Sequence, residues 1–168
     1  MSGPPLLERW LLCLLCCLAM AGCELAKPPL EIGEPVADIS LAGADGKTMA
    51  LPSSLRGRVV LIHFWADWCP LCLKELEGSK QLAQRYRQAG LEVLAINLQQ
   101  TPEQASDWIE KLKPTYPVLF DRQGEAARQF GVTGLPTSYL IDREGRLRRR
   151  IVGEMAPNQL EELVKKML

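Results

Sequence analysis

The sequence predicts a single α/β domain with a central mixed β-sheet flanked by helices, and three observations support this fold class. The chain has 168 residues, 47% of them hydrophobic, which suits one globular domain with a substantial core. Two continuous apolar runs, residues 58–65 and 91–98, have the pattern of strands buried on both faces. The amphipathic stretch 70–88 lies between them, so the three segments predict a βαβ unit with a parallel strand pair.

A short β-hairpin is predicted before this unit. Residues 36–41 and 48–51 flank the turn Ala44-Asp45-Gly46, and Asp-Gly is a strong hairpin signal. Within the unit, the helix begins at Pro70, because a proline costs nothing at the first helical position. Gly90 is expected to end this helix, since glycine is the commonest residue just after a helix C-terminus.

Further helices and strands are predicted after the βαβ unit. Thr101 as an N-cap and Pro102 at the first helical position predict a helix that runs to about residue 112. A short strand, a short helix ended by Gly131, an antiparallel hairpin and a terminal amphipathic helix follow. Their predicted bounds are 118–121 for the strand, 125–130 for the short helix, 137–141 and 147–152 for the hairpin, and 157–168 for the last helix.

The charges of the chain balance, with 20 lysines and arginines against 20 aspartates and glutamates. Nucleic acid is therefore not expected as a partner. One strand is nevertheless strongly basic, with Arg146, Arg148, Arg149 and Arg150 close together. We expect these charges to protect a sheet edge from pairing with another chain, the alternative being a contact with lipid headgroups or an acidic partner.

The N-terminal segment, residues 1–22, is predicted to be a signal peptide. The apolar stretch 10–20 follows Arg9 and is shorter than the ~20 residues that a membrane-spanning helix needs. Met20-Ala21-Gly22-Cys23 resembles the lipobox of a bacterial lipoprotein, which implies that Cys23 is lipidated. An uncleaved anchor or an ordinary secretory signal is the alternative. Residues 23–34 are rich in proline and predict a tether, with the domain at 35–168.

Export would leave two of the six cysteines, Cys69 and Cys72, within the fold. Residues three apart on a helix share a face, so the two sulfurs can meet if the Cα atoms lie within the ~4.4–6.8 Å of a disulfide. A bridge over so short a loop stabilises little. Cys69 is the expected N-cap, where the positive end of the helix favours thiolate. The pair therefore predicts a dithiol redox centre.

Two segments carry a resemblance to a known family. Residues 64–72, Phe-Trp-Ala-Asp-Trp-Cys-Pro-Leu-Cys, resemble the redox motif of the thioredoxin fold, and residues 131–142, with Leu-Pro-Thr at their centre, resemble its proline loop. The leading hairpin and the helix around Trp108 are similar to those of TlpA/ResA-type exported thiol-disulfide oxidoreductases. The resemblance implies a thioredoxin fold with an N-terminal β-hairpin extension.

The resemblance also implies roles for residues around the two cysteines. Cys69 would be the attacking thiolate, exposed at the helix start, and Cys72 would resolve the mixed disulfide. Pro136 would follow a cis peptide bond and present the backbone of Leu135 to an extended substrate. Trp68 would shield the disulfide and contact the substrate, with simple packing as the alternative.

Two residues are candidate proton acceptors for Cys72. Glu75 lies one turn further along the helix, where the resembled family carries an active-site glutamate; the alternative is a solvated surface glutamate. His63, the only histidine, stands where thioredoxins carry a buried aspartate. It is either a proton acceptor or a neutral, hydrogen-bonded core residue, and the second is favoured because burial disfavours a charged imidazole.

The predicted function is that of an exported, membrane-tethered dithiol oxidoreductase that keeps client cysteines reduced, with no cofactor beyond the Cys69–Cys72 disulfide. The resemblance implies clients such as cytochrome c precursors or oxidase-assembly factors, an integral-membrane thiol reductant, and a place on the periplasmic side of a bacterial membrane. One alternative is a copper or zinc metallochaperone that uses Cys69, Cys72 and His63, although too few ligands are present for a tetrahedral site and no metal is expected. Another is a peroxiredoxin-like peroxidase, but Ala66 stands where its activating threonine would be.

Overall fold

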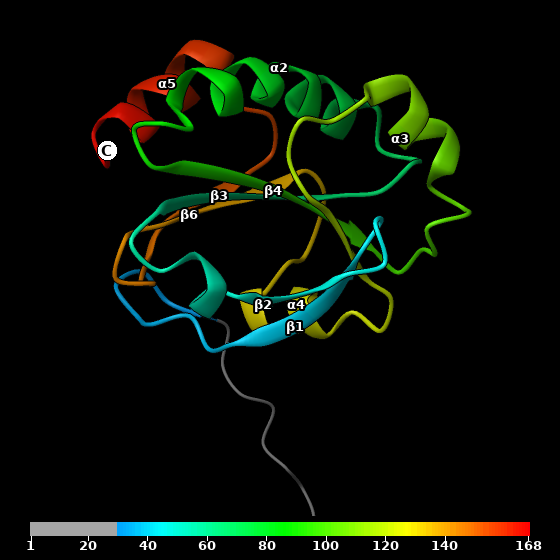
Figure 1. The fold of residues 1–168 in the computed structure, drawn as a ribbon, viewed down its shortest axis with the longest axis horizontal. Coiled ribbons are helices and arrows are strands. Elements are labelled where there is room, and N and C mark those ends of the chain that lie inside the picture. Colours follow the sequence, from blue (N-terminus) through cyan, green and yellow to red (C-terminus); the bar gives the residue numbers. More distant parts are fainter. Residues whose placement is uncertain (1–29) are drawn as a thin grey trace, which may run out of the picture.

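The computed structural model describes residues 30–168, so the predicted signal peptide and Cys23 lie outside the described residues. The leading hairpin is followed by strands and helices in the predicted order (Figure 1). The bounds are β1 Ile39–Gly43, β2 Thr48–Leu51, β3 Val59–Trp65, α2 Pro70–Tyr86, β4 Leu91–Leu98, α3 Ser106–Leu112, β5 Val118–Asp121, α4 Glu125–Phe130, β6 Thr137–Ile141, β7 Leu147–Val152 and α5 Pro157–Lys165, with a 3-10 turn η1 at Ser53–Leu55.

The seven strands form one mixed sheet in the order β2-β1-β5-β4-β3-β6-β7. The pairs β3–β4 and β4–β5 are parallel, as the βαβ pattern predicts, and β6–β7 is the predicted antiparallel hairpin. The leading hairpin joins the sheet through an antiparallel contact of β1 with β5. It therefore extends the edge of the sheet that lies opposite β7.

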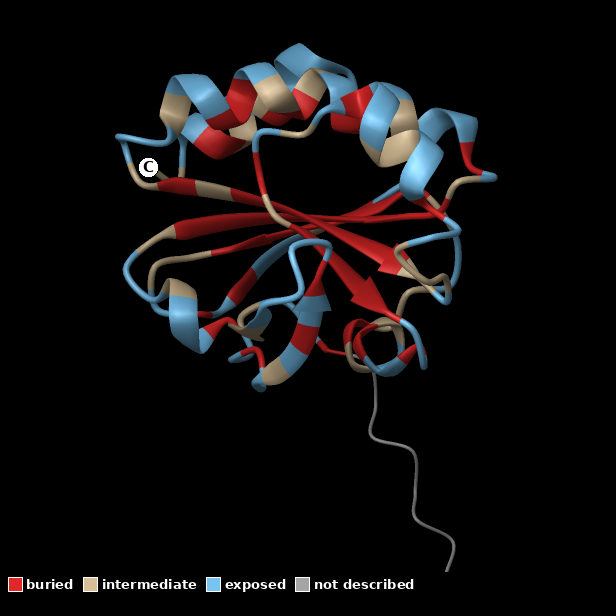
Figure 2. Ribbon diagram, turned by 45° about the vertical axis from the view of Figure 1, so that its right-hand side comes forward, coloured by how far each residue is buried: buried red, intermediate tan, exposed pale blue. Residues whose placement is uncertain are grey.

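Helices lie on both sides of the sheet. Figure 1 shows α2, α3 and α5 over one face, with α4 and the leading hairpin at the other. The strands between these layers are almost entirely buried (Figure 2). Alternation along β3 divides its side chains between the faces: Val59, Leu61 and Trp65 pack with the α2 side, and Val60, Ile62 and Phe64 pack with the α4 side. Among residues 30–168, no helix is long and apolar enough to cross a membrane.

The start of α3 differs from the prediction. The helix begins at Ser106, with Ala105 as its N-cap, and not after Thr101. Thr101 and Gln104 nevertheless make reciprocal bonds, since each backbone N–H donates to the side-chain oxygen of the other residue. These bonds close an irregular turn that precedes the helix. The capping residues therefore mark this turn and not the first residue of the regular α-helix.

Three other predicted ends lie a few residues from the observed ones. The first hairpin strand starts at Ile39 instead of residue 36, because the backbone N–H of Val36 donates to Gly145 and holds that segment elsewhere. Helix α2 ends at Tyr86 and α5 ends at Lys165, each about one turn or less before the predicted residue. Because helix ends fray, the apolar periodicity of the sequence extends beyond the residues that make regular helical hydrogen bonds.

Strand β7 lies at the edge of the sheet, as its run of arginines predicts. These arginines also hold a segment of chain against that edge: the guanidinium of Arg150 donates to the carbonyl of Leu30, and that of Arg146 donates to the carbonyl of Gly33. The Gly33 N–H in turn donates to Leu147 of β7. The chain therefore contacts the domain from residue 30 onward, before Pro35.

Candidate active site

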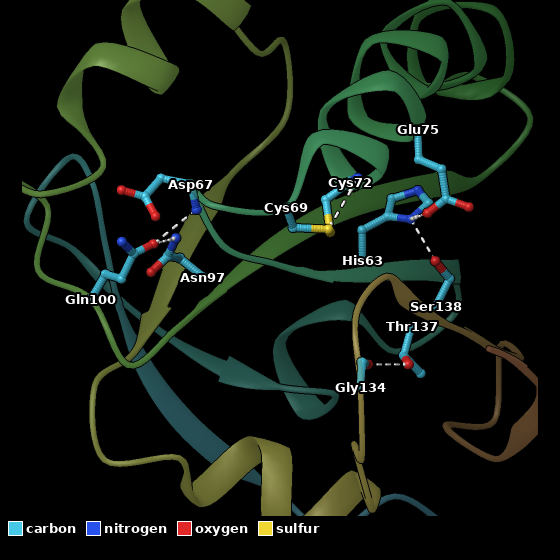
Figure 3. Close-up of a disulfide and its surroundings, with 10 residues drawn as sticks. All are labelled: His63, Asp67, Cys69, Cys72, Glu75, Asn97, Gln100, Gly134, Thr137 and Ser138. Atoms are coloured by element: carbon cyan, nitrogen blue, oxygen red, sulfur yellow. Dashed lines mark hydrogen bonds and ion pairs between the residues drawn. A yellow bond between two sulfur atoms is a disulfide. The ribbon is translucent and has the colours of Figure 1, made fainter. Parts of the chain in front are cut away.

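Cys69 and Cys72 form a disulfide at the start of α2, at the carboxyl end of β3 (Figure 3). Their Cα atoms are 5.4 Å apart, within the range that the spacing predicts. Cys69 is the N-cap, Pro70 occupies the first turn, and the backbone N–H of Cys72 donates to Cys69 Sγ at 3.2 Å. The amides and the positive end of the helix therefore point toward the sulfur of Cys69.

The sulfur of Cys69 is less accessible than expected. Cys69 is 5% exposed and Cys72 1%, so the expectation of an exposed Cys69 is wrong for the disulfide form. The reason is that both cysteines pack in the same apolar cluster as Trp65, which is fully buried beneath them. Trp68, beside the disulfide in sequence, is 69% exposed. It is a surface residue and does not fill the core.

A polar contact holds the loop between β3 and the disulfide. Oε1 of Gln100 accepts hydrogen bonds from the backbone N–H of Asp67, at 3.1 Å, and from Nδ2 of Asn97, at 2.9 Å. Figure 3 shows the three side chains together on the side of the disulfide away from His63. Gln100 thus ties the Trp-Ala-Asp-Trp loop to the end of β4, which positions the entry to α2.

A groove of about 580 Å³ has Trp68, the residue before Cys69 in sequence, and Leu135 in its lining. Of the three residues expected to contact substrate, Trp68 and Leu135 therefore share one hollow, although they are far apart in sequence, and Pro136 is not part of its lining. The peptide bond between Leu135 and Pro136 is cis, as expected from the resemblance. The hydroxyl of Thr137 donates to the carbonyl of Gly134 and closes this loop. A second cis bond, Leu51–Pro52, was not predicted and lies after β2.

His63 lies on the face of β3 that is covered by α2, because it shares the alternation of Leu61 and Trp65. It is buried, and both ring nitrogens are hydrogen-bonded: Nδ1 lies 2.7 Å from Ser138 Oγ and Nε2 lies 2.7 Å from Ser79 Oγ. Ser138 is the cross-strand partner of His63 on β6. Burial lowers the pKa of His63 to about 4, so the imidazole is neutral at ordinary pH.

Glu75 is buried on the inner face of α2, not solvated on its surface. Its Oε1 accepts the backbone N–H of Met155 at 3.1 Å, while Oε2 lies 3.8 Å from His63 Nδ1 without a hydrogen bond of normal geometry (Figure 3). Burial raises the pKa of Glu75. The Met155 N–H lowers this pKa, the charge of Glu154 raises it, and the nearby Ser138 hydroxyl lowers it. The net effect is a carboxyl that holds its proton to higher pH than usual.

The low pKa of His63 predicts a loss of stability in acid. The unfolded chain binds a proton at its imidazole near pH 6.5, and the folded protein does so only near pH 4. The contribution of His63 to the free energy of unfolding is therefore complete above pH 6.5. It falls by about 3 kcal/mol in total as the pH drops toward 4. Urea unfolding of the wild type and His63→Asn at a series of pH values measures it. Between pH 6.5 and 4, the free energy of unfolding of the wild type should fall relative to that of His63→Asn. A difference between the two proteins that is constant with pH would contradict a buried, neutral imidazole.

The sequence did not predict a role for four polar residues of this region: Ser79, Ser138, Asn97 and Gln100. A signal existed for Ser79, because Cys72, Glu75 and Ser79 recur at helical spacing on the face where Leu76 and Leu82 are apolar. No local signal marks Ser138, since its role depends on which residue of β3 lies opposite it.

The alternatives can be compared with this geometry. Among residues 30–168, no three His, Cys, Asp or Glu side chains are grouped so that they could hold a metal ion. His63 is also a poor ligand, because serine hydroxyls occupy both of its nitrogens. For a peroxidase, the position three residues before Cys69 is Ala66, which is buried and has no hydroxyl to offer.

The fold and the site together define a class of protein. A mixed sheet between helices carries a disulfide at the N-terminus of a helix, and a cis-proline loop contributes to the groove that Trp68 also lines. These features are those of a thioredoxin-like thiol-disulfide oxidoreductase.

Comparison with known proteins agrees with this class. Residues 32–150 match the family described as the AhpC/TSA family, and the chain belongs to it. The chain is 31% identical over 167 residues to the thiol-disulfide oxidoreductase ResA of Bacillus thuringiensis subsp. konkukian, covering 96% of each protein. It is therefore a member of the TlpA/ResA type predicted from the redox motif and the proline loop.

Solved structures show the same fold. One, described as a putative thiol:disulfide interchange protein DsbE from Chlorobium tepidum, has a TM-score of 0.74 and 32% identity, covering 82% of this chain and 95% of that one. Another is the pneumococcal exposed lipoprotein thioredoxin Etrx1 from Streptococcus pneumoniae, with a TM-score of 0.70 and 32% identity, covering 77% of this chain and 99% of that one. The thioredoxin fold is thereby confirmed.

Proposed function

We propose that this protein is a membrane-tethered reductant of disulfides in client proteins outside the cytoplasm. The observation that carries the proposal is the position of the Cys69–Cys72 disulfide between two features. Directly before Cys69 in sequence stands Trp68, which lines a groove together with Leu135, and one turn beyond Cys72 along α2 lies the buried carboxyl of Glu75. The first feature suits an extended client chain and the second suits removal of a proton from Cys72.

The first chemical step uses Cys69. In the reduced protein, the amides and positive end of α2 favour the thiolate of this residue. The thiolate attacks one sulfur of a client disulfide, forms a mixed disulfide, and releases the other client sulfur as a thiolate. Because Cys69 is buried in the oxidised form, a client must approach the start of α2 closely to reach its sulfur.

The second step uses Cys72 and Glu75. The Cys72 thiol gives its proton to the Glu75 carboxylate, and the resulting thiolate attacks Cys69 Sγ. The Cys69–Cys72 bond forms, the bond from Cys69 to the client breaks, and the client leaves with two added electrons. The raised pKa of Glu75 suits it to accept a proton from a buried thiol, because a weaker acid is a stronger base.

Apolar surface around the disulfide supports docking of a protein client. Trp68 and Leu71 are exposed large apolar residues on either side of Cys69 and Pro70 in sequence. Trp68 and Leu135 line the same groove, where the backbone at Leu135 can pair with an extended segment of the client. We therefore assign substrate contacts to Trp68, Leu135 and Pro136.

The sequence and the relatives support the proposed cellular setting. Lipid on Cys23 would tether the domain to the periplasmic side of a bacterial membrane, and one similar structure is itself described as an exposed lipoprotein. An integral-membrane thiol reductant would restore the Cys69–Cys72 dithiol after each turnover. Cytochrome c precursors or oxidase-assembly factors are the proposed clients, by similarity to TlpA/ResA-type proteins.

A redox titration of the purified protein against glutathione tests the direction of electron flow. A reductant should have a potential near the thioredoxin end of the family, about −270 mV, whereas a strong oxidant such as DsbA lies near about −120 mV. The fraction of Cys69–Cys72 disulfide is followed by thiol alkylation and mass measurement. A potential near the oxidising end would contradict the proposed reductase role. Metal analysis after purification under reducing conditions tests the metallochaperone alternative on the same sample.

A further inference from the structure

A chain of buried polar side chains continues from Glu75 into the interior. Its members are Glu75 and Ser79 on α2, His63 on β3 and Ser138 on β6. All four are buried. The imidazole lies at the centre, 2.7 Å from the hydroxyl of Ser138 at Nδ1 and 2.7 Å from that of Ser79 at Nε2. Oε2 of Glu75, which has no hydrogen bond of normal geometry, lies 3.8 Å from the same Nδ1.

This chain can be ordered in two opposite directions. A neutral imidazole has one donor and one acceptor nitrogen, and a serine hydroxyl rotates to donate to either side. If Glu75 is protonated, it donates toward Ser138, Ser138 donates to Nδ1, and Nε2–H donates to Ser79. If Glu75 is ionised, every one of these bonds runs the other way. Both directions satisfy the imidazole, so the protonation of Glu75 and the tautomer of His63 are linked.

Ser79, the last member of the chain, borders a second hollow, which Glu75 borders as well. Ser79 and Glu75 both contribute to a pocket of about 100 Å³, whose other lining residues include Gly78 on α2 and Pro157 and Leu160 on α5. This volume is large enough for water. The pocket lies between α2 and α5, away from the groove with Trp68 and Leu135. A proton that reaches Ser79 can therefore leave without entering the client-binding groove.

We propose that Ser138, His63 and Ser79 relay the proton that Glu75 accepts from Cys72 to the pocket between α2 and α5. The proposal rests on the proposed reductase function, because it needs a proton released at Cys72. In the relay, the Glu75 proton shifts to Ser138, the Ser138 proton to Nδ1, the Nε2 proton to Ser79, and the Ser79 proton to water. One proton enters and one leaves, no electron moves, and Glu75 returns to its carboxylate form.

Charged groups lie at both ends of the relay. Glu154, after β7, raises the pKa of Glu75 and is itself paired with Lys74 on α2. On the other side, the pocket is bordered by Arg85 of α2 and Glu161 of α5, which form an ion pair. His63 never needs to carry a full charge, since one nitrogen gains a proton as the other loses one. The low pKa of His63 is therefore compatible with the relay, although it means that the imidazole does not readily hold a second proton.

Kinetics of the second chemical step test the relay. In Ser79→Ala and in Ser138→Ala, attack of Cys69 on a client disulfide should keep its rate, whereas resolution of the mixed disulfide should slow about tenfold, less than the ~100-fold expected for loss of a direct base. The double variant should be no slower than either single one, because both interrupt the same chain. Ser106→Ala, on the exposed side of α3, is the control. Wild-type resolution rates in both single variants would overturn the relay.

Nuclear magnetic resonance provides a readout that a structural role would not move. His63 is the only histidine, so all imidazole signals belong to it. In the oxidised wild type, the ¹⁵N shifts of the ring should change from the Nε2–H to the Nδ1–H tautomer as pH rises through the pKa of Glu75. Glu75→Gln and Ser138→Ala should abolish this change. A tautomer that is constant with pH in the wild type would overturn the relay.

The two measurements also separate failure of the relay from failure of the proposed function. The tautomer experiment uses oxidised protein and needs no client, so it reports on the relay whether or not the protein is a reductase. If the tautomer is constant while clients are reduced normally, the relay is wrong and the reductase function stands. If Cys69→Ser retains full client reduction, the proposed function is wrong, whatever the tautomer does.

Discussion

Replacing Cys69 with serine is expected to reduce the rate of client disulfide reduction to the uncatalysed background. A serine hydroxyl at this position cannot form a disulfide with the client, although it can still accept the Cys72 N–H at the start of α2. Reduction of a disulfide-containing protein by the purified variant, with a thiol reductant supplied in excess, measures the effect. Full activity of Cys69→Ser would reject the mechanism.

Cys72→Ser is the informative partner of this variant. Its Cys69 thiol can still attack, but nothing resolves the product, so a mixed disulfide with the client should accumulate. Mass measurement of the complex shows it, and added thiol should release the client. The reduced wild type is the folding control for both variants, since all three lack the Cys69–Cys72 bond. Accumulation through Cys72 in Cys69→Ser would reverse the roles assigned to the two sulfurs.

Glu75→Gln is expected to slow resolution of the mixed disulfide by about 100-fold, because a glutamine cannot accept a proton from Cys72. The pH profile adds a second signature. Burial raises the pKa of Glu75, and below that pKa the carboxyl is already protonated. The wild-type rate should therefore fall as pH drops through this raised pKa, whereas Glu75→Gln should lack the inflection. Stopped-flow measurement of client release across pH gives both results.

The same substitution should have an opposite effect on stability. Because the folded protein holds the Glu75 proton more tightly than the unfolded chain, this group favours folding at low pH, and that benefit is lost as pH rises through the raised pKa. Glu75→Gln should thus be more stable than the wild type above that pKa. Glu77→Gln, an exposed residue of the same helix paired with Lys80, is the matched control. An unchanged rate and pH profile in Glu75→Gln would rule out its role as proton acceptor.

Most of the fold follows from local pattern. The apolar runs of β3 and β4 and the amphipathic helix between them identify a βαβ unit. A strand buried on both faces has a continuous apolar sequence, whereas a helix buried on one face has apolar residues at helical spacing. The contact of β1 with β5 has no such signature, since it joins residues far apart in sequence. The delayed start of α3 likewise depends on a turn that capping chemistry permits but does not specify.

At the site, residue spacing indicated that the two cysteines can meet, and resemblance indicated the cis bond before Pro136. They did not indicate how deeply Cys69 is buried. Its accessibility depends on Trp65 beneath it and on the packing of α2 against β3, which are properties of the assembled core. The groove shared by Trp68 and Leu135 is also a product of assembly, because it brings together two separate loops.

The sequence alone determined that a pair of cysteines stands at the start of a helix after a buried strand, in a chain that resembles TlpA/ResA-type oxidoreductases. Helix geometry is local, so three residues of spacing suffice to bring two sulfurs together. Only the tertiary structure decided the partners of His63. Ser138 faces it through strand register, and Ser79 and Glu75 reach it because α2 lies across that face of β3. Contacts between elements depend on register and packing, which no short segment of sequence contains.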